Sequence, residues 1–482
     1  MKIQTLTISN FRCFKHYHLE FTPGTTIVIG RNGAGKSTLI DALKIALSFI
    51  FASNKELGDD FLSAGNPSLS INSFDEHDFR MDEETRTIAP DAGIKAKASY
   101  NGTSLEWEIY KRSTANAALY SSKYKEAFRT FTHQWNARNA DLPLLAYISD
   151  SFPHKNIKET KYAIETVSKP TMPRNFGYYQ WDLSSACTSI WELRLCNKLS
   201  VYIQYKVKQM ELVATGDKLR DNEPQYHEVK EALRQLNERY SDLEEEVLFV
   251  TNRLKTFSEK LPNLQDEGYV ISNFSPVALK DGYALNLIFD NGKECLLKNL
   301  PAGYCRLYSI VLDLAYREYI LNGNKESQGI VMIDEIDLHL HPSLEQEVVG
   351  CLQNVFPLVQ FILTTHSAAV IANLDTTKKI SDVETRELIS ANQIIFMQED
   401  QSEAKILPVI FGLDYNAALR DFMGSPSRSK EMKKKGDEYL TYLSLGLTKE
   451  ADSIINNLIQ SLGIEHKYVM ELQEKAKAYE VH

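Results

Sequence analysis

A glycine-rich segment at residues 30–38 constrains the fold of this chain more than any other stretch. It reads G-x-x-x-x-G-K-S from Gly30 to Ser37, and the β-branched, apolar residues 26–29 precede it as a buried parallel strand would. Apolar residues follow at helical spacing, namely Leu39, Ile40, Leu43, Leu47 and Ile50. Strand, glycine loop and helix in this order place a phosphate at a helix N-terminus, so the segment predicts a nucleotide-binding P-loop in an α/β fold.

The side chains of this loop indicate which ligands it takes. Lys36 supplies a charge for β- and γ-phosphates, and Ser37 supplies a hydroxyl to a phosphate-bound Mg²⁺. We therefore expect ATP and Mg²⁺ as cofactors. The residues expected to bind ATP here are consecutive: Arg31, Asn32, Gly33, Ala34, Gly35, Lys36, Ser37 and Thr38.

Two later apolar runs end in polar residues suited to ATP hydrolysis. Residues 329–333 run into Asp334 and Glu335, and residues 360–365 end at His366. Asp334 is placed to hold Mg²⁺ with Ser37, and Glu335 to polarise the attacking water. His366 could donate to the γ-phosphate, so Glu335, His366 and Lys36 are the expected catalytic residues.

The segment after Glu335 allows a second interpretation. On a strand, Asp337, His339 and His341 would share a face and could hold a separate metal ion. Pro342 and the helical pattern after it favour a transition from loop to helix instead.

A heptad pattern marks residues 229–257. Nine apolar or aromatic residues alternate steps of four and three: Val229, Leu233, Leu236, Tyr240, Leu243, Val247, Val250, Leu254 and Phe257. Leu199, Ile203, Met210 and Val213 fit a weaker partner helix, with a turn near residues 216–224. The pattern predicts an inserted antiparallel hairpin arm, and a helix packed on the core is the alternative.

Other segments give coarser expectations. Residues 94–100 and 105–111 predict a β-hairpin around Asn101-Gly102, and residues 142–148 predict a buried strand. Residues 151–179, rich in Lys, Thr, Pro and Asn, predict a long surface excursion. Amphipathic helices and a basic cluster (Arg428, Lys430, Lys433, Lys434 and Lys435) predict a helical tail after residue 411.

Composition limits the partners and the compartment. The 482 residues carry a formal net charge of −10, which argues against a surface that is basic all over. The six cysteines form no C-x-x-C pair, so free thiols in a reducing cytoplasm explain them best. The first residues read as a strand without a signal peptide, and no stretch is apolar and long enough to suggest a membrane partner.

The motifs together resemble those of ABC-type ATPases related to SMC, RecF and OLD-family proteins. Their order is N-F-R-C-F at Asn10, the P-loop, L-P-A-G at Leu300, I-D-E-I-D-L-H-L-H-P at Ile333 and T-T-H-S at Thr364. Within that class, the chain looks similar to the PtuA type of Septu anti-phage systems. The resemblance implies an α/β head with a mixed sheet and flanking helices, an inserted helical-hairpin arm and a C-terminal helical tail.

The resemblance also implies how the site is completed. Two heads would sandwich ATP in a homodimer or a higher homo-oligomer. Ala302 and Gly303 would face the partner's phosphates, Asp337 would sense the partner head, and Arg12 would contact ATP. L-P-A-G-Y replaces the family's L-S-G-G-Q, which predicts slow hydrolysis, and Asp75 or Asp78 would stand in for the Q-loop glutamine.

The expected domains are 1–188 and 266–411 for the head, 189–265 for the arm and 412–482 for the tail. Residues 371–482 carry no Toprim-like Glu and Asp-x-Asp set, so we expect no nuclease activity in this chain. The expected function is a cytoplasmic defence ATPase that scaffolds and regulates a separate HNH nuclease, with DNA reached through that complex. The alternative is an SMC- or RecF-like ATPase that acts directly on DNA in repair.

Overall fold

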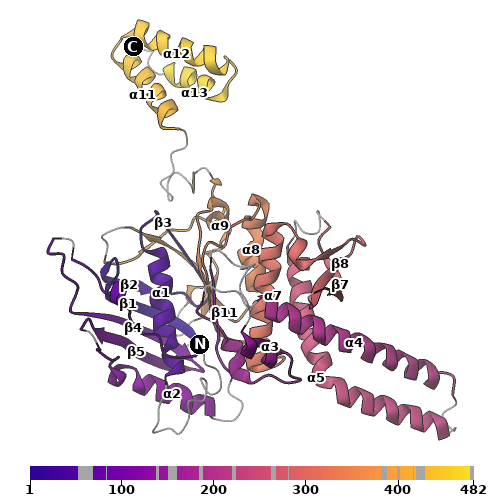
Figure 1. Ribbon diagram of the computed structural model, residues 1–482. Helices are drawn as coiled ribbons and strands as arrows, with labels where there is room; N and C mark the ends of the chain where they lie inside the picture. Colours follow the sequence, from indigo (N-terminus) through magenta and orange to yellow (C-terminus); the bar gives the residue numbers. More distant parts are fainter. Residues whose placement is uncertain are drawn as a thin grey trace. The chain divides into compact units, whose positions relative to one another are not determined.

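The computed structural model describes residues 1–52, 69–82, 84–114, 116–136, 141–149, 160–183, 188–219, 224–261, 268–280, 282–381, 388–398, 402–415, 417–418 and 429–477. The chain divides into two compact units, Met1–Leu413 and Asp414–His482, and each is described by itself (Figure 1). Arg428 of the basic cluster lies outside the described residues.

An antiparallel sheet begins the first unit. Its strand order is β2-β1-β4-β5, with bounds β1 Lys2–Phe11, β2 Phe14–Glu20, β4 Asp91–Tyr100 and β5 Thr103–Arg112. Asn101 and Gly102 have φ of 47° and 75°, as a tight hairpin turn requires between two twisted strands. The hairpin predicted around this Asn-Gly pair is confirmed, and Tyr100 faces Thr103 across the turn.

A second sheet of six strands carries the P-loop. Its order is β15-β14-β3-β11-β10-β6, with bounds β3 Thr25–Gly30, β6 Leu144–Ile148, β10 Gly329–Ile333, β11 Val359–Thr364, β14 Gln393–Met397 and β15 Lys405–Ile406. All neighbours are parallel except the edge strand β15. The carboxyl ends of the five parallel strands therefore meet at one edge, where open α/β sheets bind ligands.

Helices cover the six-stranded sheet on both faces, which confirms the expected α/β architecture. Helix α1 (Lys36–Leu47) lies between the two sheets, where Trp107 donates its indole N–H to the carbonyl of Ala46 at 2.8 Å (Figure 1). Helices α7 (Ala302–Asn322) and α8 (Pro342–Val355) lie on the other side. Because both faces are covered, the central strands read as continuous apolar runs.

Two long helices, α4 (Thr188–Gly216) and α5 (Pro224–Lys260), form an antiparallel arm that extends from the head (Figure 1). Along the heptad seam of α5, Val229, Leu233, Leu236, Tyr240 and Leu243 are half-buried against α4, whereas Val247, Val250, Leu254 and Phe257 are buried. The inner half of α5 packs on α7 and α8. Both interpretations of the heptads thus apply, each to one half of the same helix.

Of the four residues expected to line the seam of α4, only Leu199 is buried. Ile203, Met210 and Val213 are 43%, 68% and 44% exposed, so they do not line the seam. The face toward α5 instead carries Tyr205, whose hydroxyl donates to Asn237 and Glu244 at 3.1 Å each. Polar and aromatic contacts hold the outer arm together, and apolar spacing alone could not reveal them.

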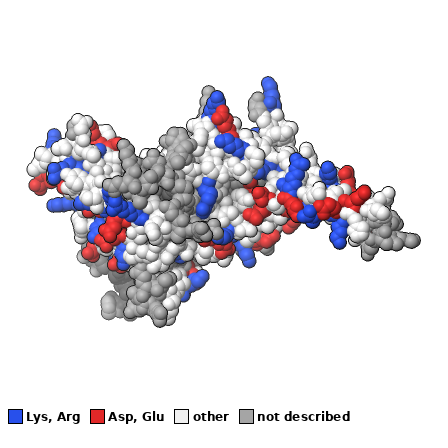
Figure 2. Space-filling model, turned by 90° about the horizontal axis from the view of Figure 1, so that it is seen from below, with Lys and Arg blue, Asp and Glu red and all other residues white. Residues whose placement is uncertain are grey.

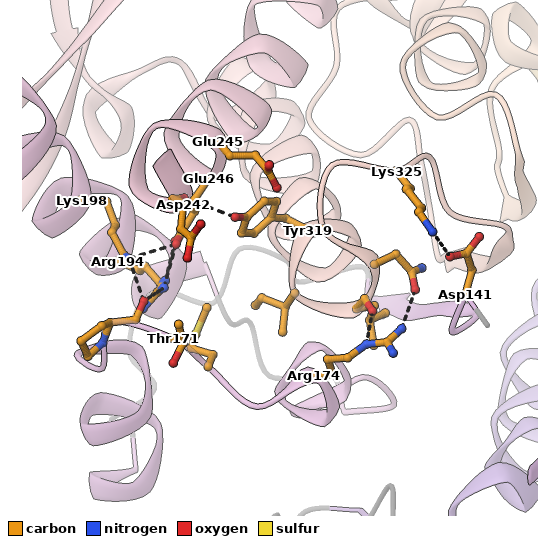
Figure 3. A pocket seen from close by; sticks show the side chains of 16 residues that line it. Asp141, Thr171, Arg174, Arg194, Lys198, Asp242, Glu245, Glu246, Tyr319 and Lys325 are labelled. Carbon is orange, nitrogen blue, oxygen red and sulfur yellow. Dashed lines mark hydrogen bonds and ion pairs between the residues drawn. The ribbon is translucent and has the colours of Figure 1, made fainter. Parts of the chain in front are cut away.

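A buried ion pair fixes the base of the arm beside a cavity of about 390 Å³ (Figure 3). The guanidinium of Arg194 on α4 contacts both oxygens of Glu246 on α5, at 2.6 and 2.8 Å. Arg194 also donates to the carbonyls of Val167, Lys169 and Pro170, and Lys198 contacts Glu246 at 3.1 Å. This network ties both arm helices to the segment that follows helix α3 (Lys161–Val167).

Replacing Glu246 with alanine is expected to lower the free energy of unfolding by about 3 kcal/mol, because it leaves a buried guanidinium without its counter-charge. Glu231→Ala on the same helix is the matched control. Glu231 pairs with Arg234 at the surface, where water screens the interaction, so its removal should change the free energy of unfolding little. Urea unfolding measures both, and equal losses would contradict the assignment.

The predicted surface excursion over residues 151–179 holds for residues 168–174, which are mostly exposed, but is wrong for residues 175–179, which are buried. Residues 160–179 include helix α3 (Lys161–Val167) and a 3₁₀ turn, η5 (Arg174–Tyr178). Phe176 and Tyr178 in that turn are fully buried, and η5 packs against α7. The burial of these two aromatic side chains therefore places this turn in the core, although the composition of the segment is typical of a loop.

A buried carboxyl on α7 predicts a pH dependence of stability. Glu318 is 1% exposed, lies 3.0 Å from Arg253 of α5 and accepts the amide N–H of Ser327. Burial raises the pKa of Glu318 from 4.5 to about 7, although Arg253 opposes the shift. The folded protein therefore binds more protons than the unfolded chain between these values, so this contribution is complete below pH 4.5 and is lost as pH rises through about 7.

Glu318→Gln is expected to remove that pH dependence. Relative to the variant, the wild type should lose up to about 3 kcal/mol of unfolding free energy between pH 5 and pH 8. Urea midpoints of both proteins at the two pH values provide the measurement. Parallel pH profiles for the two proteins would show that Glu318 titrates normally.

The second unit is a three-helix bundle of α11 (Lys430–Ser444), α12 (Thr448–Leu462) and α13 (Lys467–Ala476). It has its own hydrophobic core, which includes Tyr439, Leu458 and Leu472. Gly436 leaves room for Tyr468, whose hydroxyl donates to the Met432 carbonyl at 2.8 Å. In neither unit does a helix of the described residues combine the length and apolarity that crossing a membrane requires.

Candidate active site

The P-loop follows β3 at the carboxyl edge of the six-stranded sheet. Gly33 and Gly35 have φ of 87° and 91°, the left-handed conformation that glycine adopts without strain. A Cβ on Gly35 would lie 2.6 Å from the ring of Phe14, so the β1–β2 turn also excludes a side chain there. Gly35 is the N-cap of α1, and among the described residues no side chain caps this helix, which leaves its first N–H groups for an anion.

Lys36 lies over the loop that precedes it. Its ammonium donates to the carbonyls of Gly30 at 2.8 Å and Arg31 at 3.1 Å. Burial lowers the pKa of Lys36, and the carboxylates of Asp334 and Glu335 oppose that shift. The cation therefore faces the same edge as the two carboxylates, although they follow a different strand.

The strand order brings the predicted magnesium ligands together. Ser37 Oγ lies 3.5 Å from Asp334 Oδ2, although the two residues are 297 positions apart. Thr364, at the end of the intervening strand β11, donates its hydroxyl to the other oxygen of Asp334. A hydroxyl and a carboxylate at one strand edge are oxygen ligands of the kind Mg²⁺ prefers, so the donor set fits that ion.

Glu335 holds an unusual main-chain conformation. Its φ is 50°, which costs a non-glycine residue about 1–2 kcal/mol. Its N–H donates to Thr364 Oγ1 at 2.8 Å, and the N–H of Ile336 donates to the Thr364 carbonyl at 3.1 Å. Strain that the surroundings hold in place is typical of functional sites, and here it turns the chain directly after Asp334.

Asp337 and His366 lie beside each other. Asp337 Oδ1 accepts from the hydroxyl of Thr365 at 2.6 Å and from the main-chain N–H of His366 at 3.4 Å. The His366 side chain is exposed. On the neighbouring helix, burial and the Asp337 charge raise the pKa of Glu345, which accepts from Ser367.

The structure favours the loop-to-helix interpretation of the histidine segment. Helix α8 begins at Pro342 with His341 as its N-cap, and His339 has φ of 65° in the preceding turn. Asp337, His339 and His341 therefore do not alternate along a strand. The ring of His341 hydrogen-bonds Ser343 at 2.8 Å.

Arg12 and Asp78 pair with each other beside α1. Arg12 contacts Asp78 at 2.9 Å and Asp41 at 2.5 Å, and its φ of 47° places it in a tight turn. Asp78 also accepts the N–H of Asp75 at 2.8 Å within its own turn. To contact a nucleotide, Arg12 would have to give up its ion pairs with Asp41 and Asp78.

The signature segment packs against its own chain. Ala302 begins α7 and is exposed, whereas Gly303 is buried. A Cβ on Gly303 would lie 2.7 Å from the carbonyl oxygen of His339. Gly303 therefore allows α7 to approach the main chain at His339 closely.

Two residues of this edge were missed by the sequence reasoning. Thr364 bridges Asp334 and Glu335, and Arg306 on α7 donates to the carbonyls of both, each at 3.0 Å. Arg306 is fully buried. An arginine within an apolar helical run was the available signal, because buried charges are almost always paired.

With this geometry in place, comparison with known proteins decides the family. The model of the AAA ATPase domain matches residues 1–371. The chain belongs to this family. The P-loop, the carboxylates Asp334 and Glu335, and His366 all lie within the matched residues of this AAA ATPase.

Several relatives share sequence with this AAA ATPase. A retron Vc95 probable ATPase of Vibrio cholerae serotype O1 biovar El Tor is 24% identical, over 91% of this chain and 86% of that protein. A retron Ec83 probable ATPase of Escherichia coli is 25% identical, over 78% and 70%. The Septu protein PtuA of Bacillus mycoides (strain KBAB4) is 30% identical, but over 38% and 24% only. The similarity to the retron ATPases therefore extends further along the chain than the expected Septu similarity does.

Among solved structures, the SMC head domain from Thermotoga maritima is similar to this chain. It is 13% identical, covers 85% of this chain and 99% of that chain, and superposes with a TM-score of 0.40.

Proposed function

We propose that this AAA ATPase binds Mg²⁺–ATP at the edge formed by β3, β10 and β11 and hydrolyses it slowly. The observation that supports this most is the 3.5 Å approach of Ser37 to Asp334, which joins the P-loop to the carboxylate pair. Mg²⁺, held by Ser37 and Asp334, would supply positive charge to the phosphates.

We assign the other steps of ATP binding and hydrolysis to different side chains at this edge. Lys36 and the N–H groups of residues 31–38 bind and orient the phosphates. Glu335 takes the proton from the attacking water, and His366 donates to the γ-phosphate oxygen. Arg12 approaches the nucleotide once it exchanges its carboxylate partners.

We further propose that the working unit is a homodimer of heads. Ala302 and Gly303 would face the phosphates of the partner, and Asp337 would respond to its approach. Light scattering of Glu335→Gln with ATP tests this. A dimer predicts twice the chain mass of 54.9 kDa, about 110 kDa, and a 54.9 kDa species at every ATP concentration would refute it.

At the level of the cell, we propose a defence ATPase that regulates a separate nuclease, and the similarity to the retron probable ATPases and to the Septu protein PtuA supports this proposal. The three-helix unit is the proposed docking surface because it has its own core, outside the residues that form the ATP site. Deleting residues 414–482 should preserve ATP binding and abolish co-purification of an HNH nuclease encoded beside this chain. Full recovery of the nuclease by the truncated head would place docking elsewhere.

Direct action on DNA remains the second candidate. One observation favours it: the DNA replication and repair protein RecF of Picosynechococcus sp. is 26% identical over 40% of this chain and 50% of that protein. Stimulation of ATP hydrolysis by duplex DNA, without any nuclease present, would support this candidate over the first.

A further inference from the structure

Arg306 ties helix α7 to the main chain that carries the two carboxylates. Its guanidinium is fully buried, and Nη2 donates to the carbonyl oxygens of Asp334 and Glu335 at 3.0 Å each. Nη1 donates to the carbonyl of Ser149, beyond the end of β6, at 3.4 Å. A cation that gives up water for main-chain oxygens must gain well-placed acceptors, so this position specifies arginine rather than an apolar residue.

The main chain that Arg306 holds is the strained part of the site. The φ of 50° at Glu335 persists only because the surroundings fix it. Thr364 fixes the N–H side of Glu335, and Arg306 fixes the carbonyl side. Without the contact from Arg306, the peptide after Glu335 could rotate toward a conformation with negative φ. That rotation would turn the carboxylate of Glu335 away from the strand edge that carries the P-loop.

We propose that Arg306 is a positioning residue for hydrolysis: it holds Glu335 in the left-handed conformation that presents its carboxylate to the attacking water. In this proposal Arg306 affects hydrolysis through Glu335, although it also holds the carbonyl of Asp334. The inference rests on the proposed function, in which Glu335 is the base.

Arg306→Lys in the full-length chain tests the proposal. Lysine keeps a charge but lacks the planar guanidinium fork that reaches these two carbonyls and the Ser149 carbonyl together, so kcat should fall about 10- to 100-fold. The KM for ATP and the shift in melting temperature given by Mg²⁺–ATP should stay within about two-fold, because the P-loop is intact.

Arg317→Lys is the matched control. Arg317 lies on the same helix, is 3% exposed, and binds Asp313 and the carbonyls of Gly177 and Tyr179, away from the nucleotide edge. It should lose thermal stability to a similar degree and keep its kcat. A kcat loss in both variants, or a loss of ATP binding in Arg306→Lys, would make Arg306 merely structural and overturn the proposal.

The decisive measurement combines Arg306→Lys with Glu335→Gln. If Arg306 acts through Glu335, the double variant should be no slower than Glu335→Gln alone, to within about two-fold. Multiplied losses would overturn the proposal. If Arg306→Lys does not fold, Arg306→Gln, whose amide can reach one carbonyl, is tested in the same cycle.

The results also separate this inference from the proposed function. A large loss in Glu335→Gln with an unchanged kcat in Arg306→Lys would refute the inference and leave the base assignment standing. An unchanged kcat in Glu335→Gln would refute the base assignment, and the inference with it.

Discussion

Replacing Lys36 with alanine is expected to abolish the rise in melting temperature that Mg²⁺–ATP gives the wild type. At an ATP concentration of about 100 times Kd, binding stabilises the folded state by about 2.7 kcal/mol. Lys36 is the buried cation of the P-loop, with its ammonium over the Gly30 and Arg31 carbonyls. Thermal unfolding with and without Mg²⁺–ATP measures the effect.

Lys44→Ala provides the control for this experiment. Lys44 lies on the same helix and pairs with Asp41 at 2.7 Å, away from the glycine loop. Its removal should leave the ATP-induced shift intact. If the ATP-induced shift in melting temperature were undiminished in Lys36→Ala, ATP would bind at a site other than this loop.

Glu335→Gln is expected to lower kcat by roughly two to four orders of magnitude, as removal of a general base does, while ATP binding persists. The amide keeps the size of the side chain but cannot take the proton from water. Phosphate release at saturating ATP gives kcat, and the ATP-induced shift in melting temperature reports binding.

Glu347→Gln on α8 serves as the charge-matched control and should retain wild-type turnover. A kcat that is unaffected in Glu335→Gln would rule out this residue as the base. A simultaneous loss of the ATP-induced shift would instead assign Glu335 to binding.

The sequence predicts candidate residues for the strand edge that carries the P-loop, but not how they come together. Apolar runs ending at Asp334 and His366 predict strand ends, yet the order of strands depends on contacts between distant segments. The structure inserts β11 between β3 and β10, so Thr364 reaches Asp334. A threonine at the end of an apolar run carries no signal for that bridge.

Periodicity reported the seam of α5 correctly but could not say what covers it. The same heptads serve a two-helix arm at one end and a helix buried in the head at the other. In α4, the apolar side chains Ile203 and Met210 are exposed, while Tyr205 and Gln209 bond Asn237 of α5. Hydrogen bonds outweigh hydrophobicity on that face, and spacing arguments count only the latter.

Because α5 is one uninterrupted helix, its outer part and its buried part would move together as one rigid body. The 22 residues 224–245 come before Glu246, the first buried residue of the helix. At 1.5 Å per residue they span about 33 Å. A tilt of about 10° in the buried half would carry the far end by about 6 Å, because no loop interrupts the helix between them. A displacement of the head too small to alter its own packing would thus be amplified at the tip to the size of a side chain.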